Sequence, residues 1–278
     1  MNVVARSCRR HLAIVLAGLL CGCAHQELAA RQSQAQEIAS RHGFSMEDIP
    51  TGTYTIRTWK GPKTGSHVLH AYIEGDGFAW VSRNQPSRDP TPNDPLALRL
   101  AVQDRAANTV YLGRPCQFVM QAGSCNVRDW TSHRFSEAMV NAMDVALTHV
   151  KLESGAKEIV LIGYSGGGAM ASLLAARRGD VVHLVTVAGN LDHRAWSAAH
   201  QISALSGSLN PPDFAEKLAG VRQTHMIGAK DRVVPEQVYN AYRRVFQTNA
   251  EIVLKTIPDA DHHCCWEADW PRLLSELD

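Results

Sequence analysis

From residue 53 to the C-terminus, short apolar segments alternate with segments whose apolar residues recur every three or four positions. Short apolar or alternating segments are typical of strands, and the longer period is typical of helices with one buried face. The segments that predict strands are 53–60, 67–73, 109–112, 158–164, 182–187, 224–228 and 252–257. The segments that predict helices are 96–106, 135–152, 168–178, 192–220 with a break at 206–212, 235–246 and 266–277. This alternation indicates βαβ units, so we expect one α/β domain with a mostly parallel central sheet and helices on both faces.

A proline-rich segment interrupts the alternation after the second predicted strand. Residues 82–95 read SRNQPSRDPTPNDP and contain four prolines without an apolar period. Proline fixes φ and removes a backbone donor, so such a stretch is typical of a loop. We expect an extended loop over the surface, which is either a lid over a pocket or a plain connector.

The first 22 residues have the pattern of an export signal. Three arginines precede an apolar run at 12–20, which is too short to span a bilayer. The run ends in Leu-Cys-Gly-Cys and resembles a bacterial lipobox, with leucine three positions and glycine one position before Cys23. We therefore expect a lipoprotein signal peptide at 1–22 and lipidation at Cys23. Cleavage of an ordinary secretory signal near Ala24 is the alternative.

This interpretation places the protein at the bacterial cell envelope. Ala24, in place of an aspartate after the lipidated cysteine, favours the outer membrane, facing the periplasm, with the lipid as the membrane contact. Residues 23–52 are polar up to about residue 45, and we expect a tether or a solvated helix there. The globular domain is expected to span 53–278.

Composition adds two constraints. A hydrophobic share of 45% is enough for a packed core. The net charge of +1, from 28 basic and 27 acidic residues, gives no indication of a nucleic-acid partner.

Four cysteines follow Cys23, at 116, 125, 264 and 265. Export makes disulfides the natural state, and four cysteines allow three pairings. We favour Cys116–Cys125, which closes a short loop, because the adjacent Cys264 and Cys265 can bridge only in a strained ring. Zinc bound by Cys264 and the histidines before it is disfavoured, since no second Cys/His pair has the necessary spacing. We expect no metal or other cofactor.

The segment 163–167, Gly-Tyr-Ser-Gly-Gly, closes a predicted buried strand and opens a predicted helix. A serine on such a turn has the context of a nucleophile elbow, where glycines allow a sharp turn and the helix N-terminus supplies backbone donors. A glycine-rich turn with a capping serine is the alternative.

A serine nucleophile needs a base and an acid that orients the base. Asp231 lies in the turn after the predicted strand 224–228, and His262 lies in the loop after the last predicted strand. His263 is the rival for the base, and Asp192, after an earlier strand, is the alternative acid.

These three motifs, in this order, resemble those of α/β-hydrolases. They are the elbow at 163–167, the G-x-x-D-x-x-V-P turn at 228–235 and the Asp-His pair at 261–262. More closely, the chain resembles little-characterised bacterial α/β-hydrolase lipoproteins. The resemblance implies an α/β-hydrolase fold with Ser165 as nucleophile, His262 as general base and Asp231 as the orienting acid.

The oxyanion donors implied by the resemblance are the backbone N–H groups of Gly166 and Asp76. Here the early turn reads Glu74-Gly-Asp-Gly77, with glutamate where the family often has histidine. A carboxylate at Asp76 would oppose an oxyanion, so this side chain must point away or be paired, and Arg114 is a candidate partner.

Together these features predict an exported serine hydrolase that cleaves carboxylic esters or thioesters of a small acyl substrate through an acyl-enzyme. Amides and peptides are further candidate substrates. The alternative is a catalytically silent lipoprotein that keeps the fold as a binding or scaffolding module.

Overall fold

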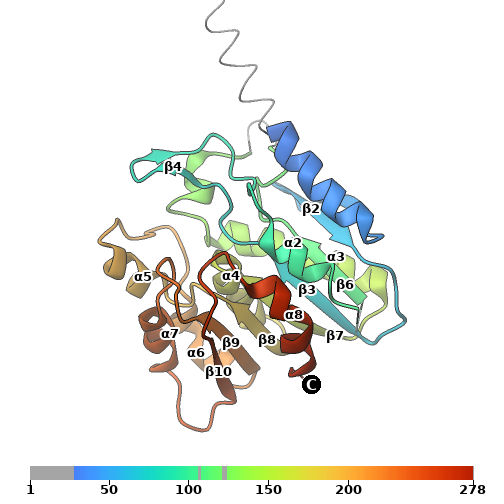
Figure 1. The fold of residues 1–278 in the computed structure, drawn as a ribbon. Helices are drawn as coiled ribbons and strands as arrows, with labels where there is room; N and C mark the ends of the chain where they lie inside the picture. The colour runs from blue at the N-terminus through green and yellow to red at the C-terminus, as the bar shows by residue number, and fades with distance from the viewer. Residues whose placement is uncertain (1–27, 106–107, 121–123, 278) are drawn as a thin grey trace, which may run out of the picture.

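A sheet of eight strands runs through the protein in the order β1-β2-β6-β3-β7-β8-β9-β10 (Figure 1). The computed structural model describes residues 28–105, 108–120 and 124–277. The strands are β1 (Ser45–Pro50), β2 (Thr55–Lys60), β3 (Val68–Ile73), β6 (Asn108–Leu112), β7 (Glu158–Tyr164), β8 (Val181–Val187), β9 (Arg222–Gly228) and β10 (Ile252–Ile257). At one edge β1 pairs with β2 and β2 with β6 in antiparallel fashion, and all other neighbouring pairs are parallel. The mostly parallel sheet predicted from the sequence is confirmed.

Helices cover both faces of the sheet (Figure 1). They are a helix at 28–41, α2 (Leu96–Ala101), α3 (Glu137–Ser154), α4 (Gly166–Ala175), α5 (His193–His200), α6 (Ala215–Leu218), α7 (Glu236–Arg243), α8 (Trp266–Ser275) and the 3-10 turns η1 (Val127–Trp130) and η2 (Pro211–Phe214). The helices α3, α4 and α7 pack in one core cluster, and α2, α8 and the helix at 28–41 pack in the other. In β7, Ile159 and Leu161 face the first cluster, whereas Val160 and Ile162 face the second. Burial on both faces explains why this strand reads as an unbroken apolar run.

The domain begins before residue 53, which corrects the boundary expected from the sequence. The strand β1 pairs with β2 along its whole length, and the helix at 28–41 buries Ala35 and Ala39 completely. The side-chain oxygen of Gln36 also accepts a hydrogen bond from the indole of Trp59, at 3.0 Å. This region lacks an apolar pattern because β1 is an edge strand with Ile49 as its one buried residue, and the helix contacts the core through small side chains.

The proline-rich segment is also more deeply placed than expected. It begins with a hairpin of β4 (Trp80–Ser82) and β5 (Gln85–Pro86), and the residues that follow are largely buried. Thr91 anchors them, since its hydroxyl accepts from the backbone N–H of Phe118 at 2.7 Å and its carbonyl accepts from Arg31 at 2.7 Å. The expectation of an extended surface loop is therefore wrong for 87–92. Polar side chains there bond to backbone groups, which allows a segment without an apolar period to be buried.

Both cysteine pairs among the described residues form disulfides. The sulfur atoms of Cys116 and Cys125 lie 2.17 Å apart, and those of Cys264 and Cys265 lie 2.11 Å apart. The signal segment 1–22 and Cys23 lie outside the described residues. Within the part of the chain that is described, no helix combines the length and the apolar character needed to cross a membrane.

A glutamate is buried at the end of β3. The side chain of Glu74 is 1% exposed, and it accepts hydrogen bonds from the backbone N–H of Gly75 at 2.9 Å and from the hydroxyl of Tyr111 at 3.1 Å. Burial disfavours the charged form and raises the pKa of Glu74 to about 7, although these hydrogen bonds act in the opposite direction.

This pKa makes the stability depend on pH in a direction that can be tested. The native state holds the proton of Glu74 more tightly than the unfolded chain, so the free energy of unfolding falls as the pH rises from 4.5 to about 7. A shift of this size corresponds to on the order of 3 kcal/mol.

We expect the free energy of unfolding of Glu74→Gln, measured by denaturant unfolding, to rise relative to that of wild type by on the order of 3 kcal/mol between about pH 5 and about pH 8. Glu158→Gln, which changes an exposed carboxylate on β7, is the matched control. Parallel pH curves for wild type and Glu74→Gln would contradict the raised pKa.

Candidate active site

Ser165 stands on a sharp turn between β7 and α4. Its backbone has φ 51° and ψ −120°, a conformation in which non-glycine residues are strained. A Cβ at Gly163 would lie 2.3 Å from the carbonyl oxygen of Gly167, and one at Gly167 would lie 2.2 Å from that of Ile73. The turn can form only because these two residues have no side chain. The Ser165 side chain makes no capping hydrogen bond, so the alternative of a capping serine is wrong.

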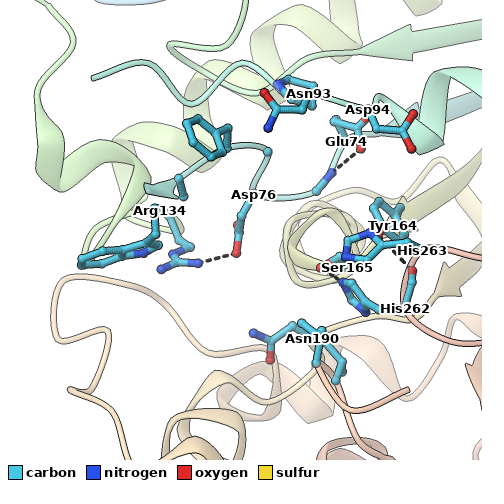
Figure 2. A pocket seen from close by; sticks show the side chains of 18 of the residues that line it. Glu74, Asp76, Asn93, Asp94, Arg134, Tyr164, Ser165, Asn190, His262 and His263 are labelled. Atoms are coloured by element: carbon cyan, nitrogen blue, oxygen red, sulfur yellow. Dashed lines mark hydrogen bonds and ion pairs between the residues drawn. The ribbon is translucent and has the colours of Figure 1, made fainter. Parts of the chain in front are cut away.

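The structure brings the three predicted catalytic side chains into one hydrogen-bonded row. The Oγ of Ser165 lies 3.0 Å from Nε2 of His262 (Figure 2). Nδ1 of His262 in turn lies 2.8 Å from Oδ2 of Asp231. Asp231 is 7% exposed and His262 5% exposed. Since a carboxylate only accepts, Nδ1 carries a proton and Nε2 is left to accept from the serine hydroxyl.

The turn after β9 holds Asp231 in place. Its second oxygen, Oδ1, accepts from the backbone N–H groups of Val233 and Val234, both at 2.8 Å. Asp192, the alternative acid, instead caps α5 by accepting from the N–H groups of Arg194 and Ala195.

The neighbouring histidine is directed elsewhere. Nδ1 of His263 lies 3.2 Å from the hydroxyl of Tyr164, and this hydroxyl donates to the carbonyl of His262 at 3.0 Å. Burial lowers the pKa of His263, and nearby His262 acts in the same direction. Of the two histidines, His262 is the one in contact with the serine.

The early turn lies against the elbow, as the oxyanion assignment requires. A Cβ on Gly75 would lie 3.3 Å from that of Ser165, and one on Gly166 would lie 2.2 Å from a carboxylate oxygen of Asp76. Neither the N–H of Asp76 nor that of Gly166 has an acceptor within the described part of the chain. Two unpaired backbone donors beside a serine are suited to an oxyanion.

The carboxylate of Asp76 is paired with two arginines. It accepts from Nη1 of Arg114 at 2.5 Å. It also accepts from Nη1 of Arg134, and Figure 2 shows this second pair. Burial disfavours the charged form of Asp76, but the charges of Arg134 and Arg114 outweigh it and lower the pKa. Arg114 was expected from the sequence, and the second pairing was not.

A cavity of about 400 Å³ opens above Ser165. Its apolar wall includes Phe78, Trp80 and Trp196. Asn190 also lines it, and its backbone N–H donates to the carbonyl of Ser165 at 2.9 Å. The side-chain oxygen of this buried residue has no hydrogen-bond partner among the residues that the structure describes. Figure 2 shows this amide directed at the open space, which makes it a candidate substrate contact. No motif in the sequence pointed to Asn190 or Trp196.

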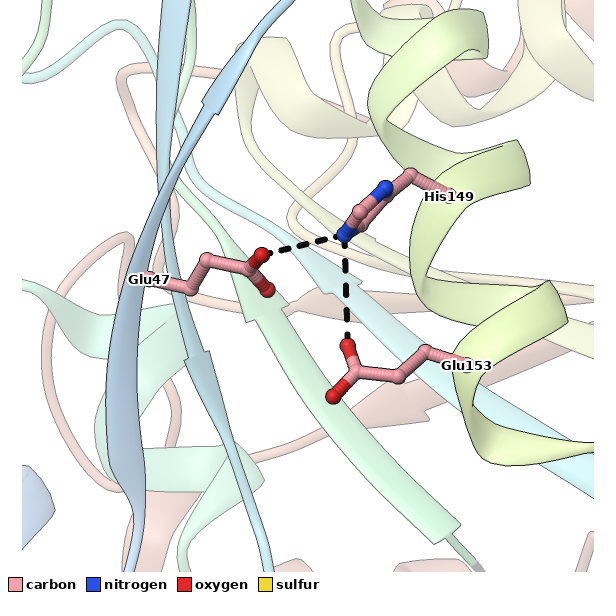
Figure 3. A group of neighbouring side chains, drawn as sticks. All are labelled: Glu47, His149 and Glu153. Carbon is pink, nitrogen blue, oxygen red and sulfur yellow. Dashed lines mark hydrogen bonds and ion pairs between the residues drawn. The ribbon is translucent and has the colours of Figure 1, made fainter.

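One cluster among the described residues has a donor set that could hold a metal ion. Glu47 on β1 and His149 and Glu153 on α3 face one another (Figure 3). The ammonium of Lys60 already binds both carboxylates, at 2.8 Å from Glu47 and 2.7 Å from Glu153. The cluster is therefore an ion-pair network that joins the β1 edge to α3.

No protein-family model matches this sequence, and no curated protein sequence matches it. Solved structures do match the fold. An alpha-beta serine hydrolase homologue from Coxiella burnetii superposes with a TM-score of 0.55 at 16% identity, over 84% of this chain and 95% of the other. The esterase Pf2001 from Pyrococcus furiosus has a TM-score of 0.60 at 12% identity, over 86% and 90%. A proline iminopeptidase from Mycobacterium smegmatis has a TM-score of 0.57 at 12% identity, over 84% and 96%.

Each match extends over nearly the whole of the other chain, and the sheet order and the elbow described above belong to the same architecture. The protein has the α/β-hydrolase fold.

Proposed function

We propose that this protein is an exported serine hydrolase that cleaves carboxylic esters or thioesters. The observation that carries the proposal is the row of hydrogen bonds from Ser165 through His262 to Asp231. The similar structures include an esterase, a serine hydrolase homologue and a peptidase, so the fold is compatible with ester or amide hydrolysis and selects neither.

The reaction would take two acyl transfers. The Oγ of Ser165 attacks the carbonyl carbon while Nε2 of His262 takes the hydroxyl proton, and Asp231 stabilises the imidazolium. The backbone N–H groups of Asp76 and Gly166 hold the negative oxygen of the tetrahedral intermediate. Its collapse breaks the bond to the alcohol or thiol, which receives the proton from His262. Water, deprotonated by the same histidine, then releases the acid and regenerates Ser165.

The paired state of Asp76 supports catalysis over the silent alternative. An unpaired carboxylate at the oxyanion turn would repel the developing negative charge. Here the two positive charges of Arg114 and Arg134 outnumber the single negative charge of Asp76. The net charge of this group of three is therefore positive and favours an oxyanion nearby.

Export and membrane anchoring through Cys23 are part of the same proposal. They rest on the basic and apolar pattern of residues 1–22 and on the Leu-Cys-Gly-Cys stretch that ends it. The two disulfides are consistent with an oxidising compartment.

We expect a fluorophosphonate to add once to the wild-type protein, because an activated serine attacks its phosphorus as it attacks a carbonyl. Ser165→Ala and His262→Ala should show no adduct by intact mass, whereas His263→Ala, the matched control for the neighbouring histidine, should keep it. A folded wild-type protein that stays unlabelled would favour the silent binding module and refute the proposed function.

The choice of acid gives a second test. Asp231→Asn should lower kcat on a chromogenic ester by about 10⁴-fold, because an amide at this position stabilises the wrong tautomer of His262. Asp192→Asn should keep kcat within about twofold, since asparagine also caps a helix. A reversed order of the two effects would assign the acid to Asp192.

The anchor can be tested by metabolic labelling with radioactive palmitate. The Cys23→Ser variant should lose the label that the wild-type protein incorporates, because serine cannot carry the thioether-linked lipid. A variant that still incorporates the label would refute lipidation at Cys23.

A further inference from the structure

A second cavity, of about 600 Å³, adjoins the one above Ser165. The two share four lining residues, Trp80, Arg134, Trp196 and Val233, so they form one continuous depression. The second cavity extends from these shared residues to the tip of the β4–β5 hairpin, the C-terminal end of α5 and the turn that carries Asp231. We call this second cavity the basic subsite, after Arg83, Arg134, His200 and Arg232 in its lining.

The charge of the basic subsite has one sign. Its lining contains three arginines and a histidine, and no aspartate or glutamate. In the described part of the chain no carboxylate forms an ion pair with Arg83 or Arg232. The hydrogen bond of Arg83 goes to a neutral backbone carbonyl, that of Gln201, at 3.3 Å. Arg134 shares the carboxylate of Asp76 with Arg114, so this group of three also has an excess of positive charge.

These basic side chains converge from separate segments, which distinguishes them from a row of solvated side chains on one helix. Arg83 comes from the hairpin, His200 from the end of α5 and Arg232 from the turn after β9. The carbonyl of Val233 holds two walls of the subsite, since it accepts from Nε1 of Trp196 at 2.7 Å and from Nε2 of His200 at 2.8 Å. These two hydrogen bonds join the end of α5 to the turn that carries Arg232.

Between Ser165 and the basic subsite the depression is aromatic. Trp80 is 41% exposed, and both it and Trp196 line the two cavities. A substrate that reaches from the serine to the arginines must therefore pass along apolar surface. The complementary molecule has a reactive carbonyl at one end, an apolar middle and an anion at the other end.

We propose that the basic subsite binds an anionic group of the substrate, a carboxylate or a phosphate, while the ester carbonyl of the same molecule lies at Ser165. Arginine side chains bind both anions through charge-assisted hydrogen bonds. This inference rests on the proposed function and specifies its substrate class.

The test compares three chromogenic esters of similar length. They are the p-nitrophenyl ester of hexanoic acid, the mono-p-nitrophenyl ester of adipic acid and the p-nitrophenyl ester of ω-phosphonohexanoic acid. We expect kcat/KM of the wild-type enzyme to be about tenfold higher for at least one anionic ester than for the neutral one. The carboxylate and phosphonate esters distinguish a substrate with a free acid from one with a phosphate group. Added salt should reduce the ratio, because ions screen exposed charges.

The variants decide whether the arginines cause the preference. In the double variant Arg83→Gln with Arg232→Gln, the ratio of anionic to neutral kcat/KM should fall to about one. Arg194→Gln is the matched control, because it removes an exposed positive charge on α5 that pairs with Asp213 and lines neither cavity. A wild-type ratio near one, or a ratio that the double variant leaves unchanged, would overturn the inference.

A readout without turnover separates this inference from the proposed function. Ser165→Ala is titrated calorimetrically with monoethyl adipate and with ethyl hexanoate, and the charged ester alone should bind, with its affinity lost when Arg83 and Arg232 are also replaced. If wild type is not labelled by the fluorophosphonate but this difference persists, the proposed function fails and the anion site stands. If Ser165 is labelled and both esters bind equally, the anion site fails and the proposed function stands.

Discussion

The site depends on backbone packing against backbone where β3 and β7 end. The missing side chains of Gly163 and Gly167 let the elbow close on itself and on the carbonyl of Ile73. This contact gives Ser165 its strained φ and sets the early turn, with the backbone N–H of Asp76, beside the serine and Gly166. One close approach thus positions both the nucleophile and the groups that would stabilise negative charge.

The same close approach brings two carboxyl groups into a buried environment next to the serine turn. It places Asp76 directly beside Gly166 and buries Glu74 at the end of β3. Asp76 is kept charged by two arginines, whereas Glu74 forms no ion pair with an arginine in the described part of the chain and its pKa is raised to about 7 by burial. The two carboxyls of this turn therefore titrate in different ranges, and the oxyanion position faces more positive than negative charge.

The sequence was sufficient for the elements that repeat a simple pattern. The strands buried on both faces and the long helix α3 were placed within a few residues because their apolar periods are strong. It failed where packing uses small or polar groups: the helix at 28–41 contacts the core through alanines, and β1 is an edge strand of mostly polar residues. The segment 192–220, predicted to be helical with a break at 206–212, forms α5, η2 and α6, and the break begins earlier than predicted because α5 ends at His200 and η2 starts at Pro211.

The candidate functional residues divide in the same way. Ser165, Asp231 and His262 could be located because each follows a recognisable strand, and the ends of parallel strands meet at one edge of a sheet. Arg83, Arg232, Trp196 and Asn190 lie in a hairpin, a turn, a short helix and a loop that share no pattern, and only the folded chain brings them around one depression. On this fold the candidate catalytic residues thus lie in local sequence motifs. The residues that determine the shape and charge of the depression are brought together only by contacts between distant segments. A search by motif therefore does not distinguish the substrates of proteins with this fold, and under the proposed function the arginines and tryptophans around the depression would make that distinction.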